Sequence, residues 1–383
     1  MPRSSTILSA SLAFGAAALL ALAVLLATPP PLPTPREVDW ASHAAGPTDE
    51  LAVYWVGHSL INARDGRVEG SRNMIERVGD FAASQGLAYE GFDNTIYGAC
   101  LSMLWRGVPH LHERRVPEML ERLRTLFEHG ERFDALVMTE GVPLEGAMRY
   151  EHSAYYAQQF YGALLERNPA ARVYLYECWS NLHASDAGRF YPRPSVYDWS
   201  ARLAEDRKRW EQLADLASTG AVPAPGLRGR FERWFGADER GRTTGAPIFL
   251  VPVGTVFGAL AKLTPEERPR FEGRALELAD LFSNAYTDWP SGWPLEAALP
   301  AEEEQAQLAK LPLRHPGEAL DDIHPSDLGV YIASLTHFAT LYRRTPVGLP
   351  ASVAGLDEPN ARRLQELVWE LVRRDPRTGV SAR

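Results

Sequence analysis

The sequence predicts an α/β fold: a three-layer α/β/α sandwich around a parallel sheet of roughly five strands. Two observations predict it, namely five short apolar runs and the amphipathic stretches of helical length that separate them. Strands of a parallel sheet are buried on both faces, so they are apolar throughout instead of alternating. In addition, no segment recurs with a period of about 20–50 residues, which excludes repeat folds. The expected strands are residues 51–57, 87–96, 133–139, 172–178 and 247–253.

The segments between and after these strands have apolar residues at helical spacing. In residues 116–129, for example, Met119, Leu123 and Leu126 fall on one side of a helix. Pro359 suits the first turn of the last helix, where a missing N–H removes no intrahelical bond. The expected helices are residues 71–84, 116–129, 150–167, 201–218, 266–283, 326–342 and 359–374.

Length and composition limit the class of protein. A chain of 383 residues, of which 45% are hydrophobic, can bury one large core, alone or with inserted elements. The formal net charge is −9 and no basic tract is present, so we expect no binding to nucleic acid. We expect one main domain at residues 51–345, with excursions at about 181–245 and 285–318, and a helical extension at 346–383.

The N-terminus carries a long apolar segment. The 21 residues from Ile7 to Ala27 are uncharged and mostly Leu, Ala and Val. A helix that spans a bilayer needs about 20 such residues, whereas the apolar part of a signal peptide has about 7–15. We therefore expect residues 1–28 to direct export. They act either as a transmembrane anchor that holds the protein on the periplasmic or other extracytoplasmic side, or as a cleaved signal peptide of a secreted protein. Residues 29–50 are expected to be a Pro-rich linker and irregular lead-in.

Five polar or small residues mark the ends of the predicted strands. Ser59, Gly98, Glu140, Trp179 and Gly254 each stand just after a strand. In open parallel sheets, ligands bind beyond the carboxyl ends of the strands, where the connecting loops meet. The strand pattern therefore predicts a site at that edge of the sheet.

Two short motifs at opposite ends of the main domain carry residues suited to nucleophilic catalysis. The first is Gly57-His58-Ser59-Leu60, directly after the first strand, and the second is Asp321-Asp322-Ile323-His324-Pro325, just before a helix. A serine hydroxyl needs a base to take its proton, and a histidine held in one tautomer by a carboxylate is such a base. Taken singly, the serine is equally well explained as a helix cap and the aspartates as turn residues. Together, the two motifs favour a catalytic serine, histidine and aspartate.

The two motifs resemble those of the SGNH, or GDSL-type, serine hydrolases, which have Gly-Asp-Ser-Leu early and Asp-x-x-His late in the chain. The resemblance covers residues 51–343 in block order. It implies a flavodoxin-like three-layer fold, with Ser59 as nucleophile, His324 as general base and Asp321 as the carboxylate that orients the base. Asp322 competes for that last role, but its spacing from the histidine differs from the family's.

The resemblance also implies an oxyanion hole with three hydrogen-bond donors. Two are the backbone N–H groups of Ser59 and of Gly98, and the third is an Asn side chain after the third strand. At that place the chain has Thr139-Glu140-Gly141 instead of a Gly-x-Asn segment. An ionised glutamate cannot donate a hydrogen bond. Three interpretations stay open: the glutamate has a different role, it is protonated, or the donor is Asn94 or Asn181.

The first motif departs from the family as well, because His58 stands where the family has an aspartate. This histidine is either a structural or surface residue, or part of the lining of the site. Asn94, Glu140 and Trp179 are further candidates for the lining, since each lies at or just after the end of a predicted strand.

Other catalytic and binding motifs do not fit the sequence. The first motif lacks the second glycine of G-x-S-x-G, which argues against an ordinary α/β-hydrolase. His110-Leu111-His112-Glu113 suggests a metal site, but no histidine follows at the H-E-x-x-H spacing, so a polar loop explains it better. Neither G-x-x-x-x-G-K nor G-x-G-x-x-G after a strand is present. We therefore expect no metal and no cofactor.

The two cysteines and the aromatic residues each leave two interpretations open. Cys100 and Cys178 either pair in an oxidising compartment or remain as buried thiols. Aromatic side chains in loops near the expected site either face the apolar sides of sugar rings or pack within the fold. These aromatic residues are Trp105, Trp179, Tyr191, Tyr197, Trp199, Trp289 and Trp293.

These observations lead to a serine-dependent ester hydrolase that acts on O-acyl esters, such as acetyl esters, of cell-envelope or extracellular glycans. Two alternatives stay open. One is a polysaccharide O-acetyltransferase, because SGNH-type domains serve both directions. The other is a catalytically inactive glycan-binding or scaffold protein, which the departure at residues 139–141 favours. The sequence does not give the oligomeric state.

Overall fold

Five parallel strands form the central sheet, in the order β2-β1-β3-β4-β5. They are β1 (Glu50–Gly57), β2 (Ala88–Thr95), β3 (Ala135–Met138), β4 (Arg172–Tyr176) and β5 (Ile248–Val251). The predicted α/β fold with a five-stranded parallel sheet is confirmed. Because the strand order reverses between β1 and β3, their carboxyl ends flank a switch point at which such sheets bind ligands.

The computed structural model describes residues 38–108, 117–183, 198–219, 222, 224–225, 246–287 and 311–381. The predicted N-terminal apolar helix, residues 1–28, lies outside this part, as do residues 29–37 of the linker and much of the two predicted excursions. The chain divides into two units, Met1–Thr34 with Pro223–Glu239, and Pro35–Val222 with Arg240–Arg383. All the elements named below belong to the second unit. Within the described ranges, no helix combines the length and the apolar character that crossing a bilayer requires.

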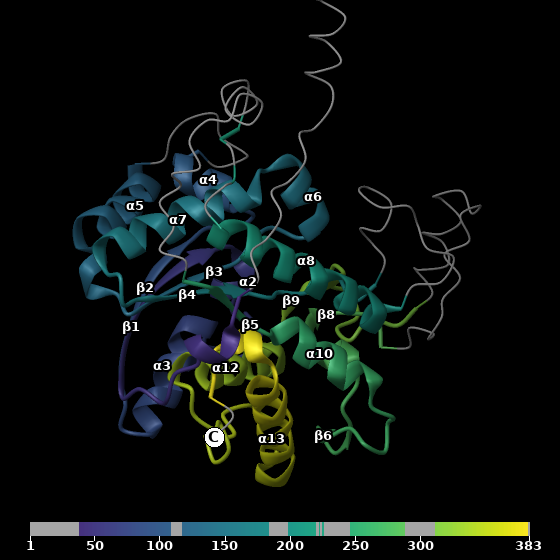
Figure 1. The fold of residues 1–383 in the computed structure, drawn as a ribbon. Coiled ribbons are helices and arrows are strands. Elements are labelled where there is room, and N and C mark those ends of the chain that lie inside the picture. Colours follow the sequence, from purple (N-terminus) through teal and green to yellow (C-terminus); the bar gives the residue numbers. More distant parts are fainter. Residues whose placement is uncertain are drawn as a thin grey trace, which may run out of the picture. The chain divides into compact units, whose positions relative to one another are not determined.

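Helices cover both faces of the sheet (Figure 1). One face carries α4 (Leu101–Arg106), α5 (Pro117–His129), α6 (Leu144–Tyr150), α7 (Ser153–Arg167) and α8 (Trp199–Thr219). The other face carries α3 (Met74–Ser84), α10 (Val253–Lys262), α12 (Asp327–Tyr342) and α13 (Glu358–Arg374). The described chain also has the short 3-10 turns η1 (Trp40–His43), η2 (Gly130–Arg132), η4 (Leu278–Leu281) and η5 (Pro376–Thr378).

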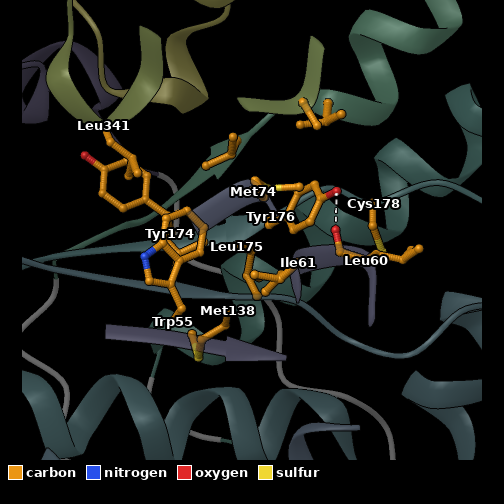
Figure 2. Packing of buried hydrophobic residues seen from close by; sticks show 14 of the residues in the cluster. Trp55, Leu60, Ile61, Met74, Met138, Tyr174, Leu175, Tyr176, Cys178 and Leu341 are labelled. Carbon is orange, nitrogen blue, oxygen red and sulfur yellow. Dashed lines mark hydrogen bonds between the residues drawn. The ribbon is translucent and has the colours of Figure 1, made fainter. Parts of the chain in front are cut away.

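The hydrophobic core extends under α2 (Ser59–Asn62), the single helical turn that follows β1. Figure 2 shows Leu60 and Ile61 among the core side chains, close to Tyr176 of β4. The Tyr176 hydroxyl donates a hydrogen bond to the carbonyl oxygen of Leu60 at 3.4 Å. One turn of helix has little stability of its own. Burial of these two side chains, worth about 1.5–3 kcal/mol each, therefore holds the turn on the sheet.

The late segment that contains the second motif is strand β9 (Asp321–Pro325), which pairs antiparallel with β8 (Phe282–Asn284). It leads directly into α12, which is capped at its N-terminus by the Ser326 side chain. In the first turn of α12, the buried Asp327 accepts a hydrogen bond from the buried Arg77 of α3 at 2.5 Å. The strand is therefore held by the β8 pairing and by the fixed start of α12.

The predicted helix at residues 266–283 is wrong. This segment forms the hairpin β6 (Arg270–Phe271) and β7 (Arg274–Ala275), followed by η4 and β8. Between the two short strands, Glu272 and Gly273 have φ angles of +52° and +79°. A two-residue hairpin turn of this kind needs positive φ at both central positions, which a right-handed helix cannot contain.

The predicted C-terminal extension contains α13, which packs on α12. The Gln365 side chain donates hydrogen bonds to the Tyr331 hydroxyl of α12 at 2.9 Å and to the Leu349 carbonyl oxygen at 2.8 Å. One edge of α13 is apolar and buried, with Leu364 and Val368 in the core. The helix thus closes the face of the sheet that α3 and α12 cover.

Candidate active site

Ser59 is the first residue of α2, at the carboxyl end of the central strand β1. Gly57 permits this tight connection, because a Cβ atom there would lie 2.6 Å from Thr139 Cγ2 and 2.8 Å from Ile61 Cδ1. The first N–H groups of a helix have no intrahelical acceptor. The strand and the turn therefore place both the hydroxyl and the backbone N–H of Ser59 at the edge of the sheet where a ligand is expected.

His324 and Asp321 lie on β9, and the fold brings both to Ser59. His324 Nε2 is 2.9 Å from Ser59 Oγ. On the other side of the imidazole, Nδ1 is 3.0 Å from Asp321 Oδ1 and 3.1 Å from Oδ2. The backbone N–H of His324 also donates to Asp321 Oδ1, at 3.0 Å. The three side chains form one hydrogen-bonded series, of the type in which a carboxylate orients a histidine and the histidine contacts a serine.

The electrostatics of this series favour an ionised carboxylate. Burial on its own would raise the pKa of Asp321, but hydrogen bonds from the side chain and backbone of His324 outweigh it and lower the pKa below its usual range. An ionised Asp321 can only accept a hydrogen bond, so it favours the tautomer of a neutral imidazole that has its proton on Nδ1. The lone pair of that tautomer lies on Nε2. That lone pair then faces the Ser59 hydroxyl, as proton abstraction requires.

Asp322, the other aspartate of the motif, makes different contacts. It is buried, and its two carboxylate oxygens accept hydrogen bonds from Asn181 Nδ2 and from the His183 backbone N–H, both at 2.8 Å. These contacts direct the Asp322 carboxylate toward the segment after β4, while the Asp321 carboxylate lies on His324 Nδ1. Asp322 ties the loop after β4 to β9, and Asp321 contacts the histidine.

A cavity of about 510 Å³ opens at the Ser59–His324 pair. This volume lies within the usual range of about 300–1,000 Å³ for small-molecule sites. The cavity is lined by His58, Ser59, Leu60, Tyr97, Gly98, Ala99, Cys100, Met103, Gly141, Val142, Pro143, Gly146, Ala147, Tyr150, Glu151, Asn181, Ile323 and His324. The walls come from the loops after β1, β2, β3 and β4 and from α4 and α6, so the cavity lies where the strand pattern predicted it.

Gly98 lies in the turn after β2 and lines the same cavity as Ser59. Its φ angle is +68°, in the left-handed region that favours glycine. Asn181 also lines the cavity, and its side-chain amide donates to Asp322. Of the two asparagines proposed as a substitute donor, only Asn181 is in the lining.

Glu140 lies behind the wall of the cavity and is fully buried. Its carboxylate Oε1 accepts hydrogen bonds from the backbone N–H groups of Gly141 at 2.7 Å and Leu101 at 3.2 Å. Burial raises the pKa of Glu140 to about 7, although these N–H groups oppose the rise. Glu140 therefore joins the turn after β3 to the start of α4, three residues after Gly98.

His58 is both structural and part of the lining. The imidazole Nε2 is 2.9 Å from the carbonyl oxygen of Glu140, and Nδ1 accepts the N–H of Leu60 at 3.4 Å. Burial lowers the pKa of His58 to about 4, so the ring is neutral near pH 7 with its proton on Nε2. It caps α2 and ties that turn to the segment after β3.

Two other predicted lining residues lie outside the cavity. Asn94 is buried at the end of β2, where its side-chain amide donates to the Tyr54 hydroxyl at 3.0 Å. Trp179 is fully buried, and its indole N–H donates to the carbonyl oxygen of Ile323 at 2.8 Å. Trp179 thus binds β9 at Ile323, which lies between Asp321 and His324 in the chain. The prediction that Asn94 and Trp179 line the site is therefore wrong.

Of the seven aromatic residues that the sequence suggested, the three that the structure describes do not line the cavity. Trp105 packs edge-on against Phe160 with ring centroids 5.0 Å apart, and Trp199 is buried. Trp179 is in the core, and Tyr191, Tyr197, Trp289 and Trp293 lie outside the described residues. Among the described residues, the aromatic side chains that line the cavity are Tyr97 and Tyr150. Tyr97 adjoins Gly98, which is the one sequence signal that pointed to it.

Metal and disulfide chemistry has no support in the described ranges. Within them, no group of three or more His, Cys, Asp and Glu residues is arranged to hold a metal ion, and His110, His112 and Glu113 lie outside them. Cys100 and Cys178 are both buried free thiols. Burial raises the pKa of each thiol, that of Cys100 to about 12, so neither is a thiolate near neutral pH.

Comparisons with known proteins give a remote structural likeness. No protein-family model matches the chain, and no curated protein matches it in sequence. The chain is similar to the crystal structure of a DUF4886 family protein from Bacteroides uniformis ATCC 8492. The sequence identity is 13% and the TM-score 0.40, over 85% of this chain and 95% of that one. A likeness this remote does not identify a function.

Proposed function

We propose that this chain is a serine-dependent ester hydrolase of the SGNH type. One observation carries the proposal: Ser59 Oγ is 2.9 Å from His324 Nε2, and the far nitrogen of that imidazole contacts the Asp321 carboxylate. The pair opens onto a cavity of about 510 Å³ beyond the carboxyl ends of the parallel strands. Nucleophile, base and orienting carboxylate are thus assembled where a substrate has room to bind.

In the first half of the proposed reaction, Ser59 Oγ attacks the ester carbonyl carbon while His324 Nε2 takes the hydroxyl proton. Asp321 stabilises the imidazolium that forms. The carbonyl oxygen becomes negative in the tetrahedral intermediate. The backbone N–H groups of Ser59 and Gly98 are the proposed donors to that oxygen, each typically worth about 10²–10³ in rate.

The intermediate collapses when His324 returns the proton to the departing alkoxide oxygen, which leaves as the alcohol, and Ser59 carries the acyl group. Water then attacks the acyl-enzyme with His324 as base, and the free acid is released. In a transferase, a sugar hydroxyl would take the place of this water. The chemistry of the three residues is the same in both cases.

We propose O-acyl esters of cell-envelope or extracellular glycans as substrates, with acetyl as the simplest acyl group. The location follows from the predicted export by residues 1–28, and the choice of ester follows from the serine mechanism. The cavity is much larger than an acetyl group, so the alcohol part of the ester fits in it as well.

The test is hydrolysis of p-nitrophenyl acetate by the full-length protein and by Ser59→Ala, His324→Ala and Asp321→Asn. Loss of the nucleophile or the base should lower kcat by about 10⁴-fold or more, and the Asp321→Asn change by about 10⁴-fold through the wrong tautomer. Ser84→Ala and His129→Ala are matched controls, because both side chains are exposed at helix ends away from the cavity.

Two results would contradict the proposal. One is a folded wild type with no esterase activity, which would favour a glycan-binding protein. The other is activity that persists in Ser59→Ala. A protein that needs an added acyl donor and a sugar acceptor would instead be an O-acetyltransferase that uses the same residues.

A further inference from the structure

Two tyrosines at the cavity stand out by their exposure. Among the large hydrophobic side chains of the described ranges, Tyr97 and Tyr150 are the most exposed, at 62% and 60%. Both line the cavity, whereas the less exposed Val68 and Phe127 do not. Single exposed apolar side chains are normal, but two aromatic rings at the mouth of one cavity are typical of a binding surface.

Tyr97 lies beside the proposed base. Its ring centroid is 6.2 Å from that of the His324 imidazole, and the two planes are inclined by 35°. In the proposed reaction, His324 Nε2 must come within hydrogen-bond reach of the leaving oxygen to protonate it. The alcohol part of the ester is attached to that oxygen. The alcohol therefore lies next to the Tyr97 ring.

The cavity also has apolar lining that suits the acyl part. Met103 of α4 and Ala147 of α6 belong to it, together with Val142 and Pro143 from the segment before α6. Met103 and Ala147 are buried, whereas the Tyr97 and Tyr150 rings are exposed. The buried apolar surface suits the small acyl group, and the exposed rings suit the alcohol part.

We infer that the alcohol part of the substrate is a sugar, whose ring packs on Tyr97 beside His324, with Tyr150 as a second ring surface at the mouth. This inference rests on the proposed ester hydrolase. A sugar has an apolar C–H face and a rim of hydroxyl groups. It therefore suits a tyrosine whose ring is apolar and whose surroundings are wet. A long-chain alcohol would instead need a buried channel, which two rings more than half exposed do not provide.

The experiment compares two acetyl esters with the full-length protein: O-acetylated xylotetraose, an uncharged sugar ester, and ethyl acetate, which has no ring. The variants are Tyr97→Ala, Tyr97→Phe and Tyr150→Ala, and Phe127→Ala is the control for an exposed aromatic residue outside the cavity. For each, kcat and KM are measured on both esters. The selectivity is the ratio of the two kcat/KM values.

Tyr97→Ala should lower the selectivity for the sugar ester by about 10-fold, mainly through KM, and Tyr150→Ala by about 3-fold. Tyr97→Phe keeps the ring and should keep most of the selectivity, and Phe127→Ala should match wild type. An equal fall on both esters in Tyr97→Ala would overturn the inference, as would unchanged selectivity or higher wild-type activity on long-chain alkyl acetates.

Direct binding separates this inference from the proposed function. Titration of xylotetraose into Ser59→Ala, followed by nuclear magnetic resonance, tests the sugar site without turnover. Weaker binding by Ser59→Ala/Tyr97→Ala would support the sugar site even if the wild type hydrolysed no ester. Conversely, Ser59-dependent hydrolysis of ethyl acetate with no sugar binding would keep the hydrolase and reject the sugar site.

Discussion

Glu140 and Glu177 are two buried glutamates in equivalent places with different neighbours. Each follows the end of a central strand, Glu140 after β3 and Glu177 after the adjacent β4, and both are almost fully buried. Burial raises the pKa of each to about 7. Glu177 has a cation beside it, because Arg207 Nη1 is 3.1 Å from its carboxylate, and the Thr255 hydroxyl lies at 3.0 Å. The described partners of the Glu140 carboxylate are two backbone N–H groups.

These different neighbours give the two glutamates different roles: Glu177 belongs to a structural ion-pair network, and Glu140 borders the cavity. Arg207 also contacts Asp375 at 2.6 Å, so Glu177 belongs to a charge network that joins β4, α8 and the end of the chain. Burial alone would lower the pKa of Arg207, but the carboxylates of Glu177 and Asp375 outweigh burial and raise it. Glu140 instead joins two backbone segments that wall the cavity. Equal burial therefore has different consequences, and three experiments test this difference.

The largest effect is expected from Glu177→Ala. Removing one partner of a buried pair leaves Arg207, which is 15% exposed, with less compensation for its charge. The free energy of unfolding should fall by at least about 3 kcal/mol, as measured by urea denaturation. The control is Glu366→Ala in the exposed Arg362–Glu366 pair, which should cost less than about 1 kcal/mol. Equal costs for the two variants would remove the basis of the comparison.

The second experiment measures the pH dependence that Glu140 imposes on stability. Its pKa rises from 4.5 to about 7 on folding, so the native state holds its proton more tightly than the unfolded chain does. The resulting stabilisation is fully present below about pH 4.5 and is lost as the pH rises to about 7. Glu140→Gln stays neutral, so its unfolding free energy relative to wild type should increase by at most about 3 kcal/mol across that window.

The comparison with wild type cancels the titration of Glu177 and of all other groups that the two proteins share. Urea denaturation at several pH values between 4 and 8 provides the measurement. A difference between the two proteins that stays constant with pH would mean that Glu140 keeps one protonation state, contrary to what its burial implies.

The smallest effect is expected from Gly98→Ala, which tests the wall that Glu140 supports. The φ angle of +68° at Gly98 disfavours a side chain, and Gly86 has the same φ and the same open space around it. Both substitutions should therefore cost about 1 kcal/mol of stability. Only Gly98→Ala should also lower kcat, by about 10-fold or more, because it displaces a proposed oxyanion donor. Equal kcat values in the two variants would exclude Gly98 from that role.

The sequence predicted the five strands of the sheet, which a local pattern of residues determines. Continuous apolar runs identified the five strands, because both faces of a parallel sheet must be buried. The helix expected at 266–283 does not form. The Glu272-Gly273 turn decides the structure of this segment instead, and a glutamate at positive φ has no clear sequence signal.

The candidate site divides in the same way. Ser59, Asp321 and His324 were identified from the sequence because their chemistry restricts the residue types and their spacing. Asn94 and Trp179 were misplaced, since position after a strand does not show which way a side chain points. Tyr97 and Tyr150 were missed as a pair because exposure depends on how α6 and the turn after β2 meet, which no local pattern contains.

The contact between Ser59 and His324 joins residues 265 positions apart in the chain. Closing a loop of this length costs chain entropy before the contact at its ends can stabilise the fold. The contact therefore forms only after the intervening strands and helices have been assembled. Under the proposed function, the first appearance of esterase activity in a refolding mixture therefore marks the docking of β9 against α2. By the same reasoning, a chain cut before β9 lacks the proposed base and should show no esterase activity.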